Sequence, residues 1–302
     1  MSTAGLNRHR RLLMLGGGAL LLGTLGRQAQ AAPAQPRVIV LGGALAEVVY
    51  ALGAQGGAHG TLVGADTTCT YPAAANALPK VGYQRALSAE GLLSLRPDLI
   101  LASAEAGPPN VLAQVKQAGV KVIAFPEHHN IESVLEKITG IAQALDVNAA
   151  GKTLRAKVES DWKQSLAEVA ASPLTHRNKP LNVLFVLNQS GNQPMVAGQR
   201  TAADAMLSYA GVRNAMQGFN GYRPLSAEAL VSAAPDVVLT TDEGLKASGG
   251  IDKLLASPGF SATPAGRDKR VVALDTLFLL GFGPRLPQAL STLNQRLQQT
   301  RA

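Results

Sequence analysis

One long internal repeat constrains the fold more than any other feature of this sequence. Segment 81–101 returns, slightly altered, as segment 220–239. From Leu87 and Leu225 onward the two copies align without a gap, at an offset of 138 residues. Solenoid repeats have periods of about 20–50 residues, so a repeat of this length indicates two similar domains. We therefore expect two lobes, with a cleft between them as the natural place for function.

Each copy of the repeat has the pattern of a helix followed by a strand. Ser88 and Ser226 are each followed by Ala-Glu and an apolar run, which is typical of the N-cap of a helix. A Pro-Asp pair ends each helix, and three aliphatic residues then indicate a strand. Other short apolar strands and amphipathic helices alternate along the chain, which is typical of parallel sheets covered by helices. Both lobes are therefore predicted to be α/β.

A long amphipathic helix is predicted near the middle of the chain. Its apolar positions recur every four residues and form a narrow stripe: Leu154, Val158, Trp162 and Leu166. We interpret this helix as the bridge between the lobes. The predicted domains are a first lobe, 32–146, an inter-lobe helix, 147–173, and a second lobe, 174–302.

The first 31 residues have the pattern of a secretory signal peptide. A basic segment, 7–11, precedes an apolar run, 12–25, and Ala29-Gln30-Ala31 has the small-x-small pattern of a cleavage site. The run is shorter than the roughly 20 residues of a spanning helix, and an uncleaved N-terminal anchor is the alternative. We expect cleavage near Ala31-Ala32 and a mature chain that is periplasmic and inserts into no membrane.

The net charge of the mature chain indicates which kinds of ligand it can bind. The full chain carries +8, and segment 1–31 holds four arginines and no acidic residue, which leaves +4. This mild positive charge suits an anionic small ligand, and no basic cluster of the kind that binds nucleic acid is present. Cys69 is the only cysteine, so no disulfide forms within the chain, and we expect it to be a small core residue.

Standard catalytic signatures are absent from the sequence. It contains no G-x-S-x-G, no P-loop and no H-E-x-x-H, and Gly42-Gly43 lacks the rest of a dinucleotide fingerprint. His128-His129 is the only histidine pair, and adjacent residues serve one metal ion poorly, so we interpret both as exposed loop residues. We expect a binding protein rather than an enzyme, and a secreted α/β enzyme stays open as an alternative.

The Gly-Tyr pair of the first copy holds the strongest candidate ligand. Tyr83 lies between a glycine and Gln84-Arg85, just before the N-cap. A rim tyrosine is one interpretation. The other is a phenolate ligand to ferric iron, since the metal and an arginine such as Arg85 or Arg223 would favour ionisation of a phenol whose reference pKa is about 10. Tyrosine can ligate haem iron, and arginine binds carboxylates, so the pattern suits a ferric porphyrin with two propionates.

Glu90 and Glu228 occupy equivalent positions in the two copies, two residues after the serine. An acid in the first helical turn stabilises the helix dipole by about 0.3–1 kcal/mol, and this local role would explain both residues. Equivalent carboxylates on two lobes would also make a two-point contact with a two-fold symmetric partner. The local chemistry of the two residues does not decide between these interpretations.

The first copy of the repeat resembles the haem-binding periplasmic proteins of bacterial ABC haem importers. The matching residues are Gly82-Tyr83-Gln84-Arg85, the Leu-Ser-Ala-Glu90 that follows, and Leu-Arg-Pro-Asp98. These proteins belong to a helical-backbone class, class III of the periplasmic binding proteins, which also contains the cobalamin and ferric-siderophore binders. The resemblance covers essentially all of the mature chain. Further matching segments are Gly42-Gly43-Ala44, 63–68, Ser226-Ala227-Glu228 and 280–285.

This resemblance implies two Rossmann-like lobes with central parallel sheets, joined by one rigid helix. It implies that Tyr83 ligates ferric haem (haem b) in the cleft and that Arg85 supports the phenolate. Arg223, beside Tyr222, would face a propionate or the Tyr83 oxygen from the other lobe. Glu90 and Glu228 would dock on arginines of a dimeric inner-membrane permease that works with ATPase subunits. We expect the mature chain to be a monomer.

Two alternatives stay open within the resemblance. Tyr71 is the rival iron ligand. Segment 187–192 contains no histidine, so we expect five-coordinate iron. The alternative cargo is a ferric siderophore or cobalamin, carried by the same fold.

Overall fold

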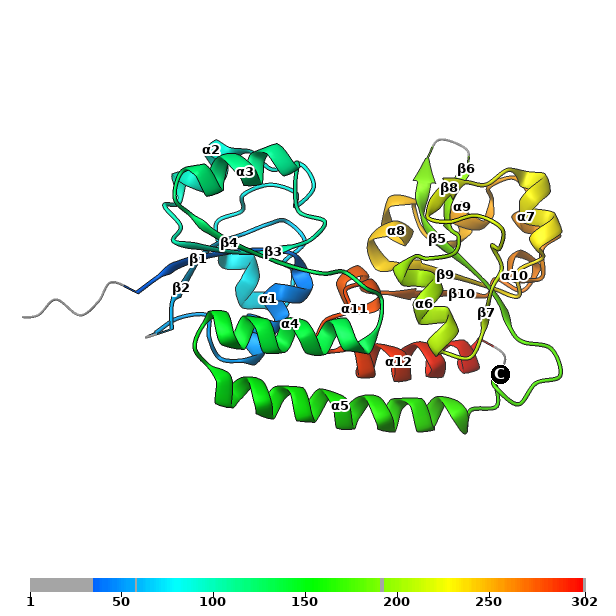
Figure 1. Cartoon of the computed structure of the whole chain (residues 1–302). Helices are drawn as coiled ribbons and strands as arrows, with labels where there is room; N and C mark the ends of the chain where they lie inside the picture. Colours follow the sequence, from blue (N-terminus) through cyan, green and yellow to red (C-terminus); the bar gives the residue numbers. More distant parts are fainter. Residues whose placement is uncertain (1–34, 58, 191–192, 301–302) are drawn as a thin grey trace, which may run out of the picture. The chain divides into compact units, whose positions relative to one another are not determined.

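Two β-sheets, built from separate halves of the chain, organise the structure (Figure 1). The structure is a computed structural model that describes residues 35–57, 59–190 and 193–300, so the predicted signal peptide lies outside the described residues. The first sheet has the strand order β2-β1-β3-β4, and the second has the order β10-β9-β5-β6-β8, with β7 paired to β5. Within the described ranges, no helix combines the length and apolar character needed to span a bilayer.

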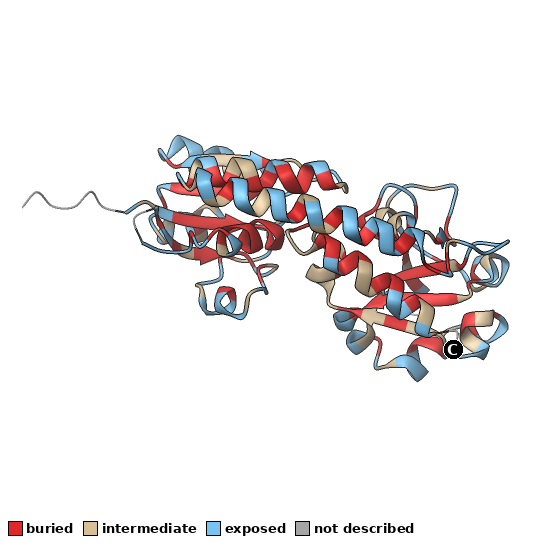
Figure 2. Cartoon of the chain, turned by 90° about the horizontal axis from the view of Figure 1, so that it is seen from below, coloured by how far each residue is buried: buried red, intermediate tan, exposed pale blue. Residues whose placement is uncertain are grey.

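The first lobe is an all-parallel sheet with its helices. Its strands are β1 (Arg37–Leu41), β2 (Thr61–Ala65), β3 (Leu99–Ser103) and β4 (Lys121–Phe125). Its helices are α1 (Gly43–Ala51), the 3-10 helix η1 (Ala73–Ala77), α2 (Ala89–Ser94), α3 (Pro109–Gln117) and α4 (Ile131–Ala144). The inner strand β3 is buried throughout and β1 nearly so, whereas the edge strand β4 is partly exposed (Figure 2). Such burial is expected of a parallel sheet covered on both faces.

The second lobe is a mixed sheet with its helices. Its strands are β5 (Asn182–Ser190), β6 (Gln193–Ala197), β7 (Arg213–Asn214), β8 (Tyr222–Pro224), β9 (Val237–Thr241) and β10 (Val271–Leu274). Its helices are α6 (Ala202–Tyr209), α7 (Ala227–Ala233), α8 (Asp242–Ala247), α9 (Ile251–Leu255), η2 (Phe260–Ala262), α10 (Pro264–Arg267), α11 (Thr276–Leu280) and α12 (Leu286–Gln299).

The predicted α/β class is confirmed, and the second sheet corrects one detail of it. Strands β5, β9 and β10 are parallel, as predicted, but β6 and β8 run antiparallel at one edge. These two strands are short, and they contain Pro194 and Pro224, which weaken a strand pattern and suit an edge. Tyr222 consequently lies in an edge strand and not in a loop.

The repeated Pro-Asp pair has the same structural role in both lobes. The carboxylate of Asp98 accepts a hydrogen bond from the backbone N–H of Arg37 (2.7 Å), and Asp236 accepts one from Asn182 N–H (2.9 Å). Each aspartate N–H donates back to the carbonyl of the same partner, at 2.8 Å in both lobes. The aspartate therefore ties the strand it precedes to the start of the neighbouring strand, which satisfies backbone groups where these inner strands begin.

The repeated serine caps a helix in both lobes, as predicted. Ser88 Oγ accepts a hydrogen bond from Gly91 N–H (3.1 Å), and Ser226 Oγ accepts one from Ala229 N–H (3.3 Å). Each cap satisfies an N–H group that has no partner within the helix. The helices that begin there, α2 and α7, therefore present their first turns in the same way.

Helix α5 (Asn148–Ala170) connects the two halves of the chain and packs on both α4 and α12. Ser165 on α5 donates a hydrogen bond to the carbonyl of Pro287 on α12 (2.9 Å). A second contact joins the lobes directly, since Arg285, just before α12, forms an ion pair with Glu47 of α1. These contacts hold the second lobe against helices of the first.

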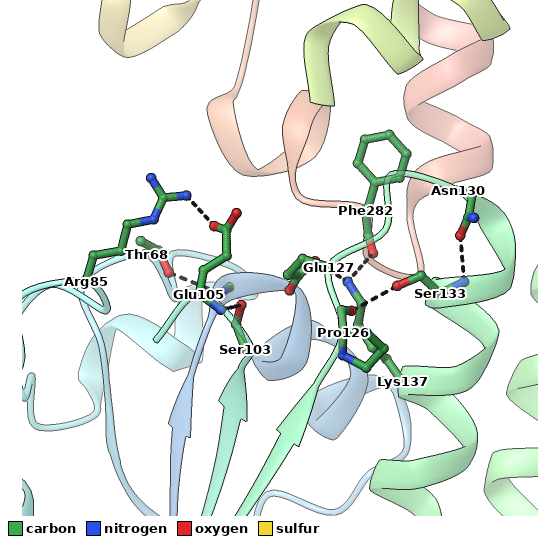
Figure 3. A network of polar contacts seen from close by, with 11 residues as sticks. Thr68, Arg85, Ser103, Glu105, Pro126, Glu127, Asn130, Ser133, Lys137 and Phe282 are labelled. Carbon is green, nitrogen blue, oxygen red and sulfur yellow. Dashed lines mark hydrogen bonds and ion pairs between the residues drawn. The ribbon is translucent and has the colours of Figure 1, made fainter. Parts of the chain in front are cut away.

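A buried lysine makes a further contact between the lobes (Figure 3). The side chain of Lys137, on α4, is 0% exposed and forms an ion pair with Glu127 (2.7 Å). Its ammonium group also donates a hydrogen bond to the carbonyl of Phe282 in the second lobe (3.3 Å). A charge removed from water in this way is tolerated only because both partners are present.

Replacing Lys137 by alanine should destabilise the protein by about 3 kcal/mol, because Glu127 would lose its partner in a largely desolvated position. Urea denaturation of the Lys137→Ala protein measures this. Lys152→Ala, at an exposed position of α5, is the control and should change stability by no more than about 0.5 kcal/mol. Lys137→Met combined with Glu127→Gln should recover most of the loss. Equal stability of the Lys137→Ala and Lys152→Ala proteins would contradict the assigned role.

Candidate functional site

A cleft of about 1180 Å³ is lined by residues of both lobes. The first lobe contributes Gly43, Ala44, Thr68, Thr70, Tyr83, Gln84, Arg85, Ser103, Glu105, Glu127 and His129. The second contributes Leu187, Asn188, Met195, Arg200, Thr201, Ala202, Gly221, Tyr222, Glu243, Thr276, Leu277, Leu280 and Gly281. Its volume exceeds the roughly 300–1,000 Å³ of drug-sized ligand pockets, so it suits a large ligand.

Many of these residues follow the carboxyl ends of parallel strands, where ligands bind in open α/β sheets. Glu105 follows β3, Glu127 follows β4, Glu243 follows β9 and Thr276 follows β10. None of these four residues belongs to a recognisable motif, so none was predicted to lie in the site. The predicted strands gave a usable signal, because each residue lies within two positions of a strand end.

Tyr83 lies in the turn before α2, and its residue is 45% exposed at the cleft. The turn is fixed by the backbone, since Ala86 N–H donates to the Tyr83 carbonyl (2.8 Å) and Thr67 N–H donates to the Gly82 carbonyl (2.9 Å). Gly82 has φ +101°, a conformation that favours glycine. The Gly-Tyr pair therefore directs a phenol into the cleft from a turn that is tied to the first sheet.

Arg85 also lines the cleft, but its partner is a carboxylate (Figure 3). Its guanidinium forms an ion pair with Glu105. This hydrogen bond raises the pKa of Arg85, and the ionised forms of Tyr83 and Tyr222 would act in the same direction. The arginine therefore shares the cleft with both phenols, one from each lobe, while it is bound to Glu105.

Tyr222 faces the cleft from the second lobe and is 40% exposed. Burial raises the pKa of its phenol, against the hydrogen bond with Thr201 and the charge of Arg85, which lower it. Arg200 lies nearby in the cleft lining, just before the Thr201 that caps α6. No motif in the sequence marks Arg200, which follows β6, the strand that pairs with the β8 strand of Tyr222.

Arg223 does not belong to the cleft lining. Its guanidinium lies 3.6 Å from the centre of the Phe219 ring, and Phe219 packs on the second-lobe core. Tyr222 and Arg223 are successive residues of strand β8, and successive side chains of a strand point to opposite faces. In this structure Arg223 therefore packs on Phe219, and its contact with a ligand stays a prediction.

Tyr71, the rival ligand, is an exposed residue outside the lining of the cleft. Its ring stacks on the guanidinium of Arg285 at 3.6 Å, and Arg285 is itself paired with Glu47. This stacking gives Tyr71 a structural role at the contact between the lobes.

His129 was interpreted as an exposed loop residue, but it lies in the cleft lining. Its ring packs 5.3 Å from that of Phe282, and burial lowers its pKa. His128, its neighbour, is exposed. A neutral imidazole in the cleft is a second group able to ligate a metal carried by a ligand. Among the described residues, no three His, Cys, Asp or Glu side chains group to hold a bare metal ion.

The Gly42-Gly43 pair has a packing role at the cleft. A Cβ atom on Gly43 would lie 2.5 Å from Leu277 Cδ1 and 2.6 Å from the Thr68 carbonyl oxygen. Only glycine therefore allows α1 of the first lobe to approach Leu277 of the second. This accounts for the pair without a bound dinucleotide.

Glu90 and Glu228 lie away from the cleft lining, exposed in the first turns of α2 and α7. Hydrogen bonds to its own backbone and to Ser226 lower the pKa of Glu228, which is therefore ionised at neutral pH. The two carboxylates hold equivalent positions on the two copies of the repeat.

The sequence and the fold match a known protein family. A family model described as periplasmic binding protein matches residues 38–276. The chain belongs to the periplasmic binding protein family. Members of this family bind solutes for transport, in line with the class III fold that the sequence predicted.

Solved structures and curated relatives resemble the chain over most of its length. The periplasmic haem-binding protein BhuT, solved with two haems, is 64% identical, covers 89% of this chain and 100% of its own, and superposes with a TM-score of 0.86. The periplasmic haem-binding protein RhuT from Roseiflexus sp. RS-1 is 39% identical over 88% of this chain and 99% of its own, with a TM-score of 0.81. The vitamin B12-binding protein of Vibrio vulnificus is 25% identical over 85% of this chain and 87% of its own.

Proposed function

We propose that this chain is a periplasmic haem-binding protein that captures ferric haem in the cleft and delivers it to an inner-membrane ABC permease. The observation that carries the proposal is the 64% identity to BhuT over the whole length of that protein. RhuT, at 39%, supports the same cargo. The cobalamin alternative rests on relatives of lower identity, such as the protein of Vibrio vulnificus at 25%.

The residues of the cleft fit a ferric porphyrin. Tyr83 and Tyr222 present half-exposed phenols from opposite lobes, and a phenolate is a suitable axial ligand of ferric haem. Tyr83 is the proposed ligand, because its turn is fixed to the sheet and the cationic Arg85 lies near it and would favour ionisation. Tyr222 and Arg85 would surround the liganded oxygen.

The other parts of a haem molecule also find suitable groups. Arg200 lines the cleft, and a guanidinium binds carboxylates such as propionates through paired N–H donors. Apolar side chains in the lining would contact the porphyrin faces: Ala44, Leu187, Met195, Leu277 and Leu280. The mature chain's charge of +4 would favour this ligand, whose two propionates leave it with a net negative charge.

In the delivery step, the exposed first turns of α2 and α7 would contact the permease. Glu90 and Glu228 are exposed on equivalent helices of the two lobes, so they would form two matching contacts with arginines of a dimeric permease. The cleft and the docking residues lie on different elements. Haem binding and permease docking would therefore be separable by mutation.

Titration of the purified mature chain with ferric haem tests the proposed cargo. We expect saturable binding and the absorption spectrum of a high-spin ferric haem with a phenolate ligand. The break point gives the number of haems per chain, and BhuT has been solved with two. Cobalamin and a ferric siderophore serve as competitors. Tight binding of either of them without any binding of haem would contradict the proposal.

A further inference from the structure

Arg85, the arginine of the Gly-Tyr-Gln-Arg segment, is held in an ion pair with Glu105 (Figure 3). Arg85 is two residues from Tyr83, yet within the described part of the chain no hydrogen bond joins the two side chains. The guanidinium is bound to the Glu105 carboxylate instead, although either cleft phenol, once ionised, would attract it. Arg85 is therefore within electrostatic reach of Tyr83 but is held by another acid.

This ion pair is weak enough to exchange. The side chains of Arg85 and Glu105 are 54% and 42% exposed, and ion pairs with this exposure shift an equilibrium by about fivefold or less. Arginine has a long, flexible side chain and five N–H donors, so its guanidinium can turn to another acceptor without a change in the fold.

Glu105, in contrast, lies on a fixed backbone. Its N–H donates to Ser103 Oγ (3.2 Å), and the N–H of the preceding residue donates to the Phe125 carbonyl on β4 (2.8 Å). The backbone that carries this carboxylate is therefore fixed at the carboxyl end of β3. We infer that the arginine side chain is the partner that moves.

We propose that Glu105 is a positioning residue that acts through Arg85, and the proposal rests on the proposed haem-binding function. In the empty cleft Glu105 holds the guanidinium. When haem binds, the Tyr83 phenol loses its proton to solvent and ligates the iron as a phenolate, while the propionates enter the cleft. Arg85 then exchanges Glu105 for one of these anionic oxygens. The same carboxylate competes for Arg85 when haem leaves. Glu105 thus limits the affinity of the cleft and favours release of its cargo.

The Glu105→Gln protein tests this proposal through the dissociation of ferric haem, measured by transfer to excess apomyoglobin. We expect dissociation to slow by about threefold to fivefold, the factor expected of an exposed ion pair. The matched control is Glu159→Gln, because Glu159 pairs with Arg155 on α5 at a similar exposure of 41% and 43% and lies outside the cleft lining. The control should release haem at the wild-type rate.

A double-mutant cycle separates action through Arg85 from a direct effect of the lost negative charge. In an Arg85→Gln background, Glu105→Gln should leave the dissociation rate unchanged. An equal slowing in that background would overturn the proposal, and so would wild-type or faster release from the single variant. Thermal melting of each protein identifies a variant that fails to fold.

A measurement that does not use iron reports on the arginine itself. In the ligand-free protein, the Arg85 Nε–H signal in a ¹⁵N NMR spectrum should shift on Glu105→Gln. Gallium protoporphyrin IX, a diamagnetic analogue of ferric haem, should shift the same signal in the wild-type protein. An Arg85 signal that the porphyrin leaves in place would overturn the exchange. If the wild-type protein binds no haem or gallium porphyrin, the proposed function fails instead, while the pairing of Arg85 with Glu105 is still seen without ligand.

Discussion

Replacing Tyr83 by alanine should weaken the binding of ferric haem by at least about 100-fold, because even the loss of a residue that only supports a metal ligand costs about 10–100-fold in affinity. The phenol lies on a turn fixed by backbone hydrogen bonds at the cleft, so no neighbouring side chain of the turn can replace it. The phenolate-to-iron charge-transfer band in the visible absorption spectrum should disappear at the same time. Haem titration followed by absorption measures both effects.

Three other variants identify the ligand if it is not Tyr83. Tyr71→Ala should keep the charge-transfer band, since Tyr71 stacks on Arg285 outside the cleft lining. Tyr222→Phe should also keep the band, because the second phenol is proposed only to surround the liganded oxygen. His129→Ala should leave the spectrum high-spin. Loss of the band in one of these proteins, with retention in Tyr83→Ala, would transfer the ligand role to that residue.

The internal repeat made much of the fold predictable. The serine N-caps depend on contacts within the repeat, and the structure shows them in both lobes. The Pro-Asp pairs also precede a strand in both lobes, as predicted, although their aspartates bond to Arg37 and Asn182, which lie far outside the repeat. Local pattern was sufficient for the serine caps because the partner of Ser88 is three residues away. The parallel strands followed from their apolar runs for the same reason.

The lining of the cleft was less predictable, because it depends on strand pairing between distant segments. Arg223 was predicted to face a ligand because it lies in the second copy of the Gly-Tyr segment, whereas in the structure its guanidinium packs on Phe219, on the side of β8 opposite Tyr222. The antiparallel strand β6 lacked a clear pattern, and with it Arg200 was missed. Glu105 and His129 lacked a motif, although each follows a predicted strand. Position at strand ends was the signal that would have found them.

Replacing Glu90 and Glu228 together by alanine should reduce haem delivery by at least about 100-fold, since loss of one partner in each of two buried interfacial charge pairs costs about 2 kcal/mol or more per pair. Both carboxylates are exposed and lie outside the cleft lining. Haem affinity and the absorption spectrum of the doubly substituted protein should therefore match the wild type. Haem uptake into proteoliposomes that contain the cognate importer measures delivery.

The control for this experiment is another exposed acid in the first turn of a helix. Glu132 is an exposed acid in the first turn of α4, so Glu132→Ala removes the same charge and helix-dipole interaction without touching the repeat. It should deliver haem at the wild-type rate. If Glu90 and Glu228 serve only the helix dipole, the doubly substituted protein will also deliver haem normally and will merely be slightly less stable. Each single variant should retain intermediate delivery, because a two-fold symmetric permease would still hold one lobe through the remaining carboxylate.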